Sequence, residues 1–214
     1  MTEEEARAWL KAQFDVPRET WERLECYVAI LLSAMDEQNL IAESTRPHVW
    51  ARHIVDSAQL MLHAKAAGEG EWLDLGSGAG LPGIVLACLS DRPLRMVESR
   101  RKRIDFLNDV IADLSLKNAS VFGGRVEMVP ATAAAVISAR AYAPLPKLLS
   151  SALHLSDKNS LWVLPKGRNA QNELEATRPA WQGVFHVEPS VTDADSAIIV
   201  ARSVQPAGKR KSRA

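Results

Sequence analysis

Four glycines within eight residues constrain what this chain can fold into more than any other feature of its sequence. An apolar run of strand type, residues 72–75, precedes them, and an apolar run of helical type, residues 84–87, follows them. Glycine tolerates positive φ and lets the backbone approach a ligand, and the unpaired N–H groups of a helix start point at such a ligand. The segment therefore predicts a nucleotide-binding turn. Its glycines are Gly76, Gly78, Gly80 and Gly83.

The glycine segment matches two kinds of nucleotide site. The spacing Gly78-x-Gly80-x-x-Gly83, with the acid Glu98 eighteen residues after Gly80, fits the dinucleotide fingerprint. The wider pattern D-x-G-x-G-x-G, which begins at Asp74, resembles the first motif of S-adenosylmethionine-dependent methyltransferases. A carboxylate beside the turn suits that cofactor, because its amino acid end is cationic and it has no pyrophosphate.

The composition is that of an ordinary globular protein with room for one sizeable domain. The 214 residues have a net charge of zero, are 47% hydrophobic and contain no apolar stretch of membrane-spanning length. The acidic start M-T-E-E-E-A-R is unlike a signal peptide. We therefore expect a cytoplasmic protein with no membrane partner. Neutrality argues against broad coating of nucleic acid but permits local basic patches.

The apolar pattern predicts three helices followed by alternating strands and helices. Repeated strand–helix units imply a parallel sheet covered on both faces. We therefore predict an α/β fold with a mostly parallel seven-stranded sheet, an antiparallel terminal hairpin and an N-terminal helical extension. This arrangement resembles the Rossmann-like fold of class I S-adenosylmethionine-dependent methyltransferases more than that of dehydrogenases. The expected helices span residues 2–14, 19–35, 47–62, 100–116, 145–153 and 170–177, and the expected strands 72–75, 94–98, 120–122, 133–138, 161–164, 184–187 and 197–200.

We expect residues 1–207 to form one methyltransferase domain. Residues 1–66 are its helical extension and 67–207 its cofactor-binding α/β core. Residues 208–214 are basic and lack a large apolar side chain, so they predict a disordered tail.

Open α/β sheets bind ligands at the carboxyl ends of their strands, where the strand order reverses. Glu98 has the spacing to accept hydrogen bonds from ribose hydroxyls, and Asp74 is placed to meet the cationic end of S-adenosylmethionine. Val126 and Glu127 are candidates to flank an adenine. The cofactor candidates at predicted strand ends are Asp74, Gly76, Gly78, Leu81, Glu98, Val126, Glu127 and Arg140.

Four successive cations open the helix predicted after the second strand: Arg100, Arg101, Lys102 and Arg103. Cations at a helix start oppose the helix dipole and repel one another. That cost predicts a polyanion that neutralises them, and phosphate contact with RNA is the preferred interpretation. Lys166, at the end of the fifth strand, is a further candidate for RNA contact.

Several longer segments are more specific in combination than the glycine turn alone. They are N-L-I-A (39–42), R-H-I-V-D-S (52–57), D-L-G-S-G-A-G-L-P-G-I (74–84), E-S-R-R-K-R-I-D-F-L (98–107), I-S-A-R-A-Y-A-P-L-P-K-L-L (137–149) and L-P-K-G (164–167). Together they resemble, over nearly the whole chain, the bacterial ribosomal RNA small subunit methyltransferase G family, also called glucose-inhibited division protein B.

This resemblance implies transfer of a methyl group from S-adenosyl-L-methionine to N7 of one guanine in 16S rRNA near the decoding centre. It implies 16S rRNA or the 30S subunit as partner, and no metal. It also implies that Gly76, Leu81, Val126, Glu127 and Arg140 line the cofactor site.

Guanine N7 carries a lone pair and no hydrogen, so its methylation needs no general base. We therefore assign no catalytic residue, which agrees with the lack of an acid in the run Ala133-Ala134-Ala135 that opens the predicted fourth strand. Two other functions remain open: an NAD-dependent oxidoreductase, from the overlapping G-x-G-x-x-G, and a non-catalytic RNA-binding ribosome-assembly factor, from the basic run and tail.

Overall fold

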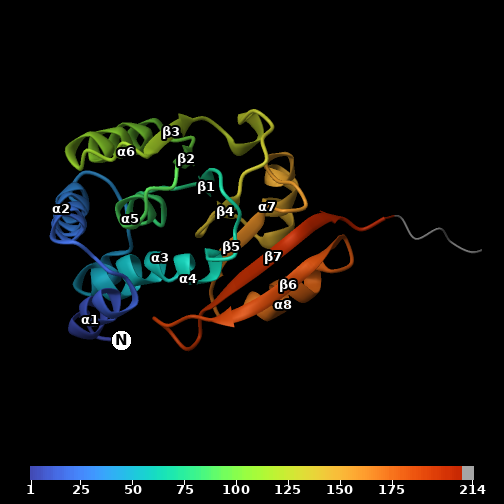
Figure 1. The fold of residues 1–214 in the computed structure, drawn as a ribbon, viewed down its shortest axis with the longest axis horizontal. Coiled ribbons are helices and arrows are strands. Elements are labelled where there is room, and N and C mark those ends of the chain that lie inside the picture. The colour runs from blue at the N-terminus through green and yellow to red at the C-terminus, as the bar shows by residue number, and fades with distance from the viewer. Residues whose placement is uncertain (209–214) are drawn as a thin grey trace, which may run out of the picture.

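The computed structural model describes residues 1–208, so the basic tail predicted at 208–214 lies, from residue 209 on, outside the described residues. At its centre is a seven-stranded sheet in the order β3-β2-β1-β4-β5-β7-β6, with helices on both faces (Figure 1). Strands β1 to β5 are parallel, and β7 is antiparallel to β5 and β6. The predicted mostly parallel sheet with an antiparallel hairpin is confirmed. The strands are β1 (Trp72–Leu75), β2 (Leu94–Glu98), β3 (Ala119–Gly123), β4 (Val136–Ser138), β5 (Leu161–Lys166), β6 (Trp181–Pro189) and β7 (Ala197–Pro206).

The strand order reverses between β1 and β4. The chain runs from β1 outward through β2 to β3 and then returns to β4 on the other side of β1. Asp74 of β1 pairs with Met96 of β2 and Ser138 of β4, so the ends of these three strands meet at one edge of the sheet. Such a reversal is where open α/β sheets bind ligands.

Side chains of β1 alternate between two apolar clusters, one on each face of the sheet. Trp72 belongs to the cluster formed with α5, α6 and the N-terminal helices, whereas Leu73 and Leu75 belong to the cluster formed with α7 and α8. The core helices all lie where the sequence predicts them. They are α5 (Gly83–Leu89), α6 (Arg101–Asp113), α7 (Leu145–Ala152) and α8 (Ala170–Thr177).

The N-terminal helices share the apolar cluster of α5. Thr2 and Glu5 form a capping box at the start of the first helix, with N–H to oxygen distances of 2.8 and 3.2 Å. The buried hydroxyl of Tyr27 donates to the carbonyl of Ala79 at 2.8 Å, which ties the extension to the glycine turn. The two long helices are α1 (Glu3–Gln13) and α2 (Arg18–Ala34).

The helix predicted over residues 47–62 is divided into shorter pieces. The Glu3 carboxylate of α1 accepts hydrogen bonds from the N–H groups of Trp50 and Ala51, both at 3.0 Å. A new helical start is thus capped by a residue far away in the sequence, which no local pattern reveals. The pieces are a 3₁₀ segment (Glu43–His48), a π-helical segment (Trp50–Val55), α3 (Asp56–Ala58) and α4 (Leu60–Ala64).

Two strand predictions need correction. β4 begins at Val136 and not at residue 133, because the N–H of Ala134 bonds to the carbonyl of Leu155 in place of a sheet partner. The hairpin strands are longer than predicted. Their pairing extends from Pro189 opposite Ala197 at the turn to Trp181 opposite Pro206 at the far end.

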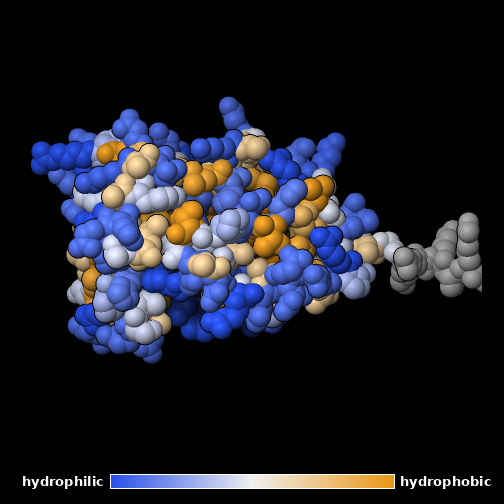
Figure 2. All heavy atoms as spheres, turned by 90° about the horizontal axis from the view of Figure 1, so that it is seen from below, coloured by the Kyte–Doolittle hydropathy of each residue, from blue (hydrophilic) through white to orange (hydrophobic). Residues whose placement is uncertain are grey.

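The outer surface mixes polar and apolar side chains. On the face shown in Figure 2, apolar groups are small and separated by hydrophilic ones. Within residues 1–208, no helix has both the length and the apolar character that crossing a membrane requires.

Candidate active site

The glycine turn follows β1 and has a backbone conformation that other residues rarely adopt. The φ angle is +68° at Gly76 and +58° at Gly78. A Cβ atom on Gly76 would lie 2.6 Å from Cδ2 of Tyr142, which is closer than real contacts allow. Residue 76 therefore requires glycine for both conformation and space.

Asp74 lies behind the glycine turn, and its side chain is 0% exposed. Its Oδ2 accepts a hydrogen bond from the Gly83 N–H at 3.2 Å, and its Oδ1 accepts one from the Ser138 hydroxyl at 2.9 Å. Ser138 in turn accepts from Trp72 Nε1–H at 2.9 Å. Burial raises the pKa of Asp74 to about 6, although these hydrogen bonds act in the opposite direction.

Asp74 has a structural role in addition to its predicted contact with the cationic end of a cofactor, which stays a prediction. The period-two alternation of β1 turns Asp74 to the face of Trp72, toward the start of α5. The Gly83 N–H, which the sequence suggests should point at a ligand, is bonded to this carboxylate. Asp74 thus fastens the glycine turn to α5 and β4 from within the protein.

Glu98 joins the end of β2 to the glycine turn. Its Oε2 accepts from the Gly78 N–H at 3.0 Å, and its Oε1 accepts from the N–H groups of Ser99 at 2.7 Å and Arg100 at 2.9 Å. The side chain is 5% exposed. Because each carboxylate oxygen has two lone pairs, Oε2 can still accept a ligand hydroxyl.

A first cavity of about 420 Å³ lies beside Glu98 at this edge of the sheet. Four of the predicted cofactor residues line it, namely Gly76, Glu98, Val126 and Glu127. Its other lining residues are Val97, Ser99, Arg100, Arg103, Gly124, Arg125, Ala141, Tyr142, Ala143 and Lys147. Sequence reasoning missed Tyr142 and Lys147, although both belong to the segment 137–149 that carries the family resemblance.

The remaining cofactor candidates do not line the first cavity. The Gly78 N–H is bonded to Glu98, and Leu81 is buried in the apolar cluster of α5. Arg140 lines a different cavity. Gly78 and Leu81 therefore shape the turn without facing this space.

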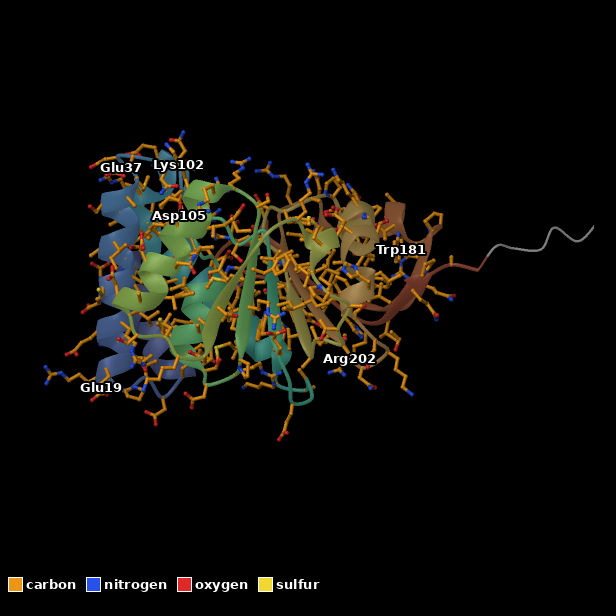
Figure 3. The ribbon with its side chains drawn as sticks, turned by 90° about the horizontal axis from the view of Figure 1, so that it is seen from above. Glu19, Glu37, Lys102, Asp105, Trp181 and Arg202 are labelled. Atoms are coloured by element: carbon orange, nitrogen blue, oxygen red, sulfur yellow. The ribbon has the colours of Figure 1, made fainter. Side chains whose placement is uncertain are left out.

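The basic run lies at the start of α6, next to the first cavity. Arg100 and Arg103 line that cavity, and all four cations border a shallow hollow with Gln38 and Asn39. Figure 3 shows Lys102 and Glu37 together at one edge of the molecule. Arg101 forms an exposed ion pair with Asp105 at 3.0 Å, which is a weak interaction.

Lys166 is separate from this run. Its ammonium group pairs with Glu173 at 3.1 Å and donates to the carbonyl of Ala143 at 3.3 Å. Its side chain is 12% exposed and lines the second cavity. Lys166 thus lies apart from the run of Arg100 to Arg103, and its contact with RNA stays a prediction.

The second cavity, of about 440 Å³, holds a cluster of charged and polar side chains. Arg140 Nη1 donates to His53 Nδ1 at 3.1 Å and contacts Asp56 Oδ2 at 3.5 Å. Burial, followed by the nearby charge of Arg140, lowers the pKa of His53 to about 3, so the ring is neutral. Sequence reasoning noted R-H-I-V-D-S only as part of the resemblance. The signal was a set of polar residues close together inside an apolar helical stretch.

The chain matches the family model described as rRNA small subunit methyltransferase G over residues 20–198. It is 52% identical over 211 residues to a ribosomal RNA small subunit methyltransferase G of Rhizorhabdus wittichii, which covers 98% of this chain and 96% of the relative. It is 49% identical over 213 residues to the protein of the same name from Zymomonas mobilis, with 96% of each chain covered.

Solved structures share the fold at low sequence identity. A SAM-dependent methyltransferase from Aquifex aeolicus aligns with a TM-score of 0.56 and 12% identity, over 73% of this chain and 92% of that one. The glycopeptide N-methyltransferase MtfA in complex with S-adenosyl-L-methionine aligns with a TM-score of 0.57 and 9% identity, over 70% and 94%. The fold is thus that of S-adenosylmethionine-dependent methyltransferases, and the chain belongs to the rRNA small subunit methyltransferase G family.

Proposed function

We propose that this chain methylates N7 of a specific guanine in 16S rRNA near the decoding centre, with S-adenosylmethionine as methyl donor. The observation that carries the proposal is the first cavity, which joins the glycine turn to Glu98 at the point where the strand order reverses. Support also comes from relatives that are named as ribosomal RNA small subunit methyltransferases.

The residues of the first cavity fit this cofactor. Val97 and Val126 offer apolar surface to an adenine, and Glu98 offers acceptor capacity to ribose hydroxyls. Gly76 has no side chain and so leaves space beside Tyr142, whereas a larger residue would clash with the Tyr142 ring. When bound, S-adenosylmethionine supplies an electrophilic methyl group on a positively charged sulfur.

The protein's task is then to align the nucleophile and to exclude water. Guanine N7 attacks with its lone pair, so no side chain has to remove a proton. Orientation of two reactants can alone supply several kcal/mol of the barrier reduction. Glu127, which lines the first cavity, acts electrostatically on the purine as it becomes cationic.

Arg100 to Arg103 hold the RNA backbone beside the first cavity. Three of these residues are exposed, and none of the four is a fully buried cation. Contacts of this kind position the substrate without reading its sequence.

The test is to map modified nucleotides in 16S rRNA from cells with and without this protein, and to repeat methylation in vitro on 16S rRNA and on 30S subunits. We expect one N7-methylguanine that depends on the protein and on S-adenosylmethionine. Calorimetry separates the alternatives, since tight binding of NADH without binding of S-adenosylhomocysteine would support an oxidoreductase. Binding of neither, with retained RNA affinity, would support a non-catalytic assembly factor.

A further inference from the structure

The second cavity lies at the same edge of the sheet as the first. Ala141 lines both cavities, so they are neighbours. Leu40, Ile41, Pro165 and Ile198 give the second cavity apolar walls, and its volume of about 440 Å³ is typical of a small-molecule pocket. Apolar walls with a few polar groups suit a flat aromatic ligand that has a polar edge.

Asp56 supplies the acceptor in this cavity. Its Oδ1 accepts hydrogen bonds from the Gln59 side-chain amide at 3.0 Å and the Thr192 hydroxyl at 3.1 Å, and these two bonds fix its orientation. Its Oδ2 makes, within residues 1–208, one long contact of 3.5 Å with Arg140. The side chain is 18% exposed. Oδ2 therefore keeps lone pairs for a ligand that donates hydrogen bonds.

Arg140 supplies the donors. Among the described residues, the hydrogen bonds of the Arg140 side chain all involve Nη1, which contacts His53 Nδ1, the Arg52 carbonyl and Asp56. The neutral His53 ring accepts at Nδ1 and donates from Nε2 to the Thr45 hydroxyl at 2.8 Å. Nη2 and Nε of Arg140 remain available to a ligand, beside the free acceptor of Asp56.

The main chain is also unusual at this wall. Arg52 and His53 lie in the π-helical segment, and Asp56 follows it directly. π-helical turns are rare and occur frequently at functional sites. Here the turn brings three polar side chains of one segment to the same cavity.

We propose that the second cavity receives the target guanine, turned out of the RNA, with Asp56 accepting from its N1–H and N2 amino group and Arg140 donating to O6. This inference rests on the proposed function. Enzymes that act on a base commonly extrude it and read its Watson–Crick edge with hydrogen bonds. Asp56 and Arg140 are specificity-determining residues in this arrangement, and neither takes part in the chemistry.

The arrangement also explains why N7 stays reachable. In guanine, N1 and the N2 amino group lie on the pyrimidine-ring edge, whereas N7 lies on the imidazole ring across the base. A carboxylate on the first edge leaves N7 uncovered, and Ala141 marks where the second cavity meets the first. Adenine has an unprotonated N1 at the same place, so it would set a lone pair against the Asp56 carboxylate.

The test compares 16S rRNA in which the target guanosine alone is replaced, assembled into 30S subunits if naked RNA is inert. Inosine keeps N1–H, O6 and N7 but lacks the N2 amino group, and 7-deazaguanosine lacks N7. For the unaltered enzyme we expect kcat/KM to fall about 10- to 100-fold with inosine, the loss that follows when a buried charged acceptor loses one partner. No methylation of 7-deazaguanosine is expected.

Asp56→Ala then checks the residue. Without the carboxylate, guanosine and inosine should react at rates within about threefold of each other, while the affinity for S-adenosylhomocysteine stays unchanged. Asp195→Asn is the matched control, because it removes an exposed carboxylate from the β6–β7 turn, and it should keep the preference for guanosine.

Equal reaction of inosine and guanosine with the unaltered enzyme would overturn the pocket assignment while leaving N7 methylation intact. Methylation of 7-deazaguanosine would instead refute the proposed function. The comparison with the unaltered enzyme needs no variant, so it decides the matter even if Asp56→Ala fails to fold.

Discussion

The buried carboxylate of Asp74 makes the stability of this protein depend on pH in a specific direction. Its pKa is about 6 in the folded protein, against an ordinary value of 3.8, because burial disfavours the charged form. The folded state therefore binds the proton more tightly than the unfolded state. The contribution of Asp74 is most favourable below about pH 4 and is lost as the pH rises through about 6.

The size of the effect follows from the shift. A change from 3.8 to about 6 is roughly two units, and each unit corresponds to about 1.4 kcal/mol, so the loss is about 3 kcal/mol. Asp74→Asn cannot titrate at this position. The free energy of unfolding of the native sequence minus that of the variant should thus fall by about 3 kcal/mol between about pH 3 and about pH 8. A constant offset from the altered hydrogen bonds does not affect this difference.

Urea unfolding of both proteins at closely spaced pH values measures the difference directly. Subtracting one curve from the other removes the titration of all groups that the two proteins share. Asp36→Asn, which removes an exposed carboxylate, serves as the control for loss of charge. A difference that stays flat, or that rises with pH, would show that Asp74 is not held in a desolvated environment.

Four shorter predictions test other parts of the site. Gly76→Ala should weaken the binding of S-adenosylhomocysteine at least tenfold in calorimetry, since the added Cβ has no space; an unchanged affinity would contradict the assignment of the first cavity. Arg101→Gln with Lys102→Gln should reduce the slope of log affinity for RNA against log salt concentration by about 0.7 to 0.9 per lost phosphate contact. The same slope as in the native protein would mean that these cations only form the solvent-exposed face of α6. Tyr27→Phe should lower the free energy of unfolding by about 1–3 kcal/mol, because the Ala79 carbonyl loses a buried donor; a loss near zero in urea titrations would disprove that. The rate of single-turnover methylation should not change with pH between about pH 7 and 9. A rate that rises with pH, and that loses this dependence when one side chain is replaced, would reveal a general base.

The sequence predicted the sheet and one edge of the site because both follow from short-range patterns. The glycine turn after β1 and the acid that ends β2 are local signals, and the alternation of strands and helices determined where their ends would meet. Glu98 illustrates this success, since its position alone placed it beside the first cavity.

The sequence did not predict features that depend on contacts between distant segments. Asp74 has the right spacing for a ligand contact, but its direction depends on how α5 packs against β1. The second cavity joins Asp56, Arg140, Lys166 and Thr192, which no window of the sequence contains together. The extended pairing of β6 and β7 likewise comes from the two strands meeting each other and not from the pattern of either one.

The hydrogen bond from Tyr27 to Ala79 has a consequence for how this chain can be divided. Residues 1–66 precede the α/β core in the sequence and look separable from it. The Tyr27 side chain of this segment nevertheless holds the glycine turn that shapes the first cavity. Helices α2 and α3 also pack against α5, and their apolar residues belong to the same cluster. A fragment that starts at residue 67 should therefore expose this surface, aggregate and fail to bind cofactor. The extension is expected to behave as an inseparable part of the catalytic unit, so a functional truncation or fusion has to preserve both halves in one polypeptide.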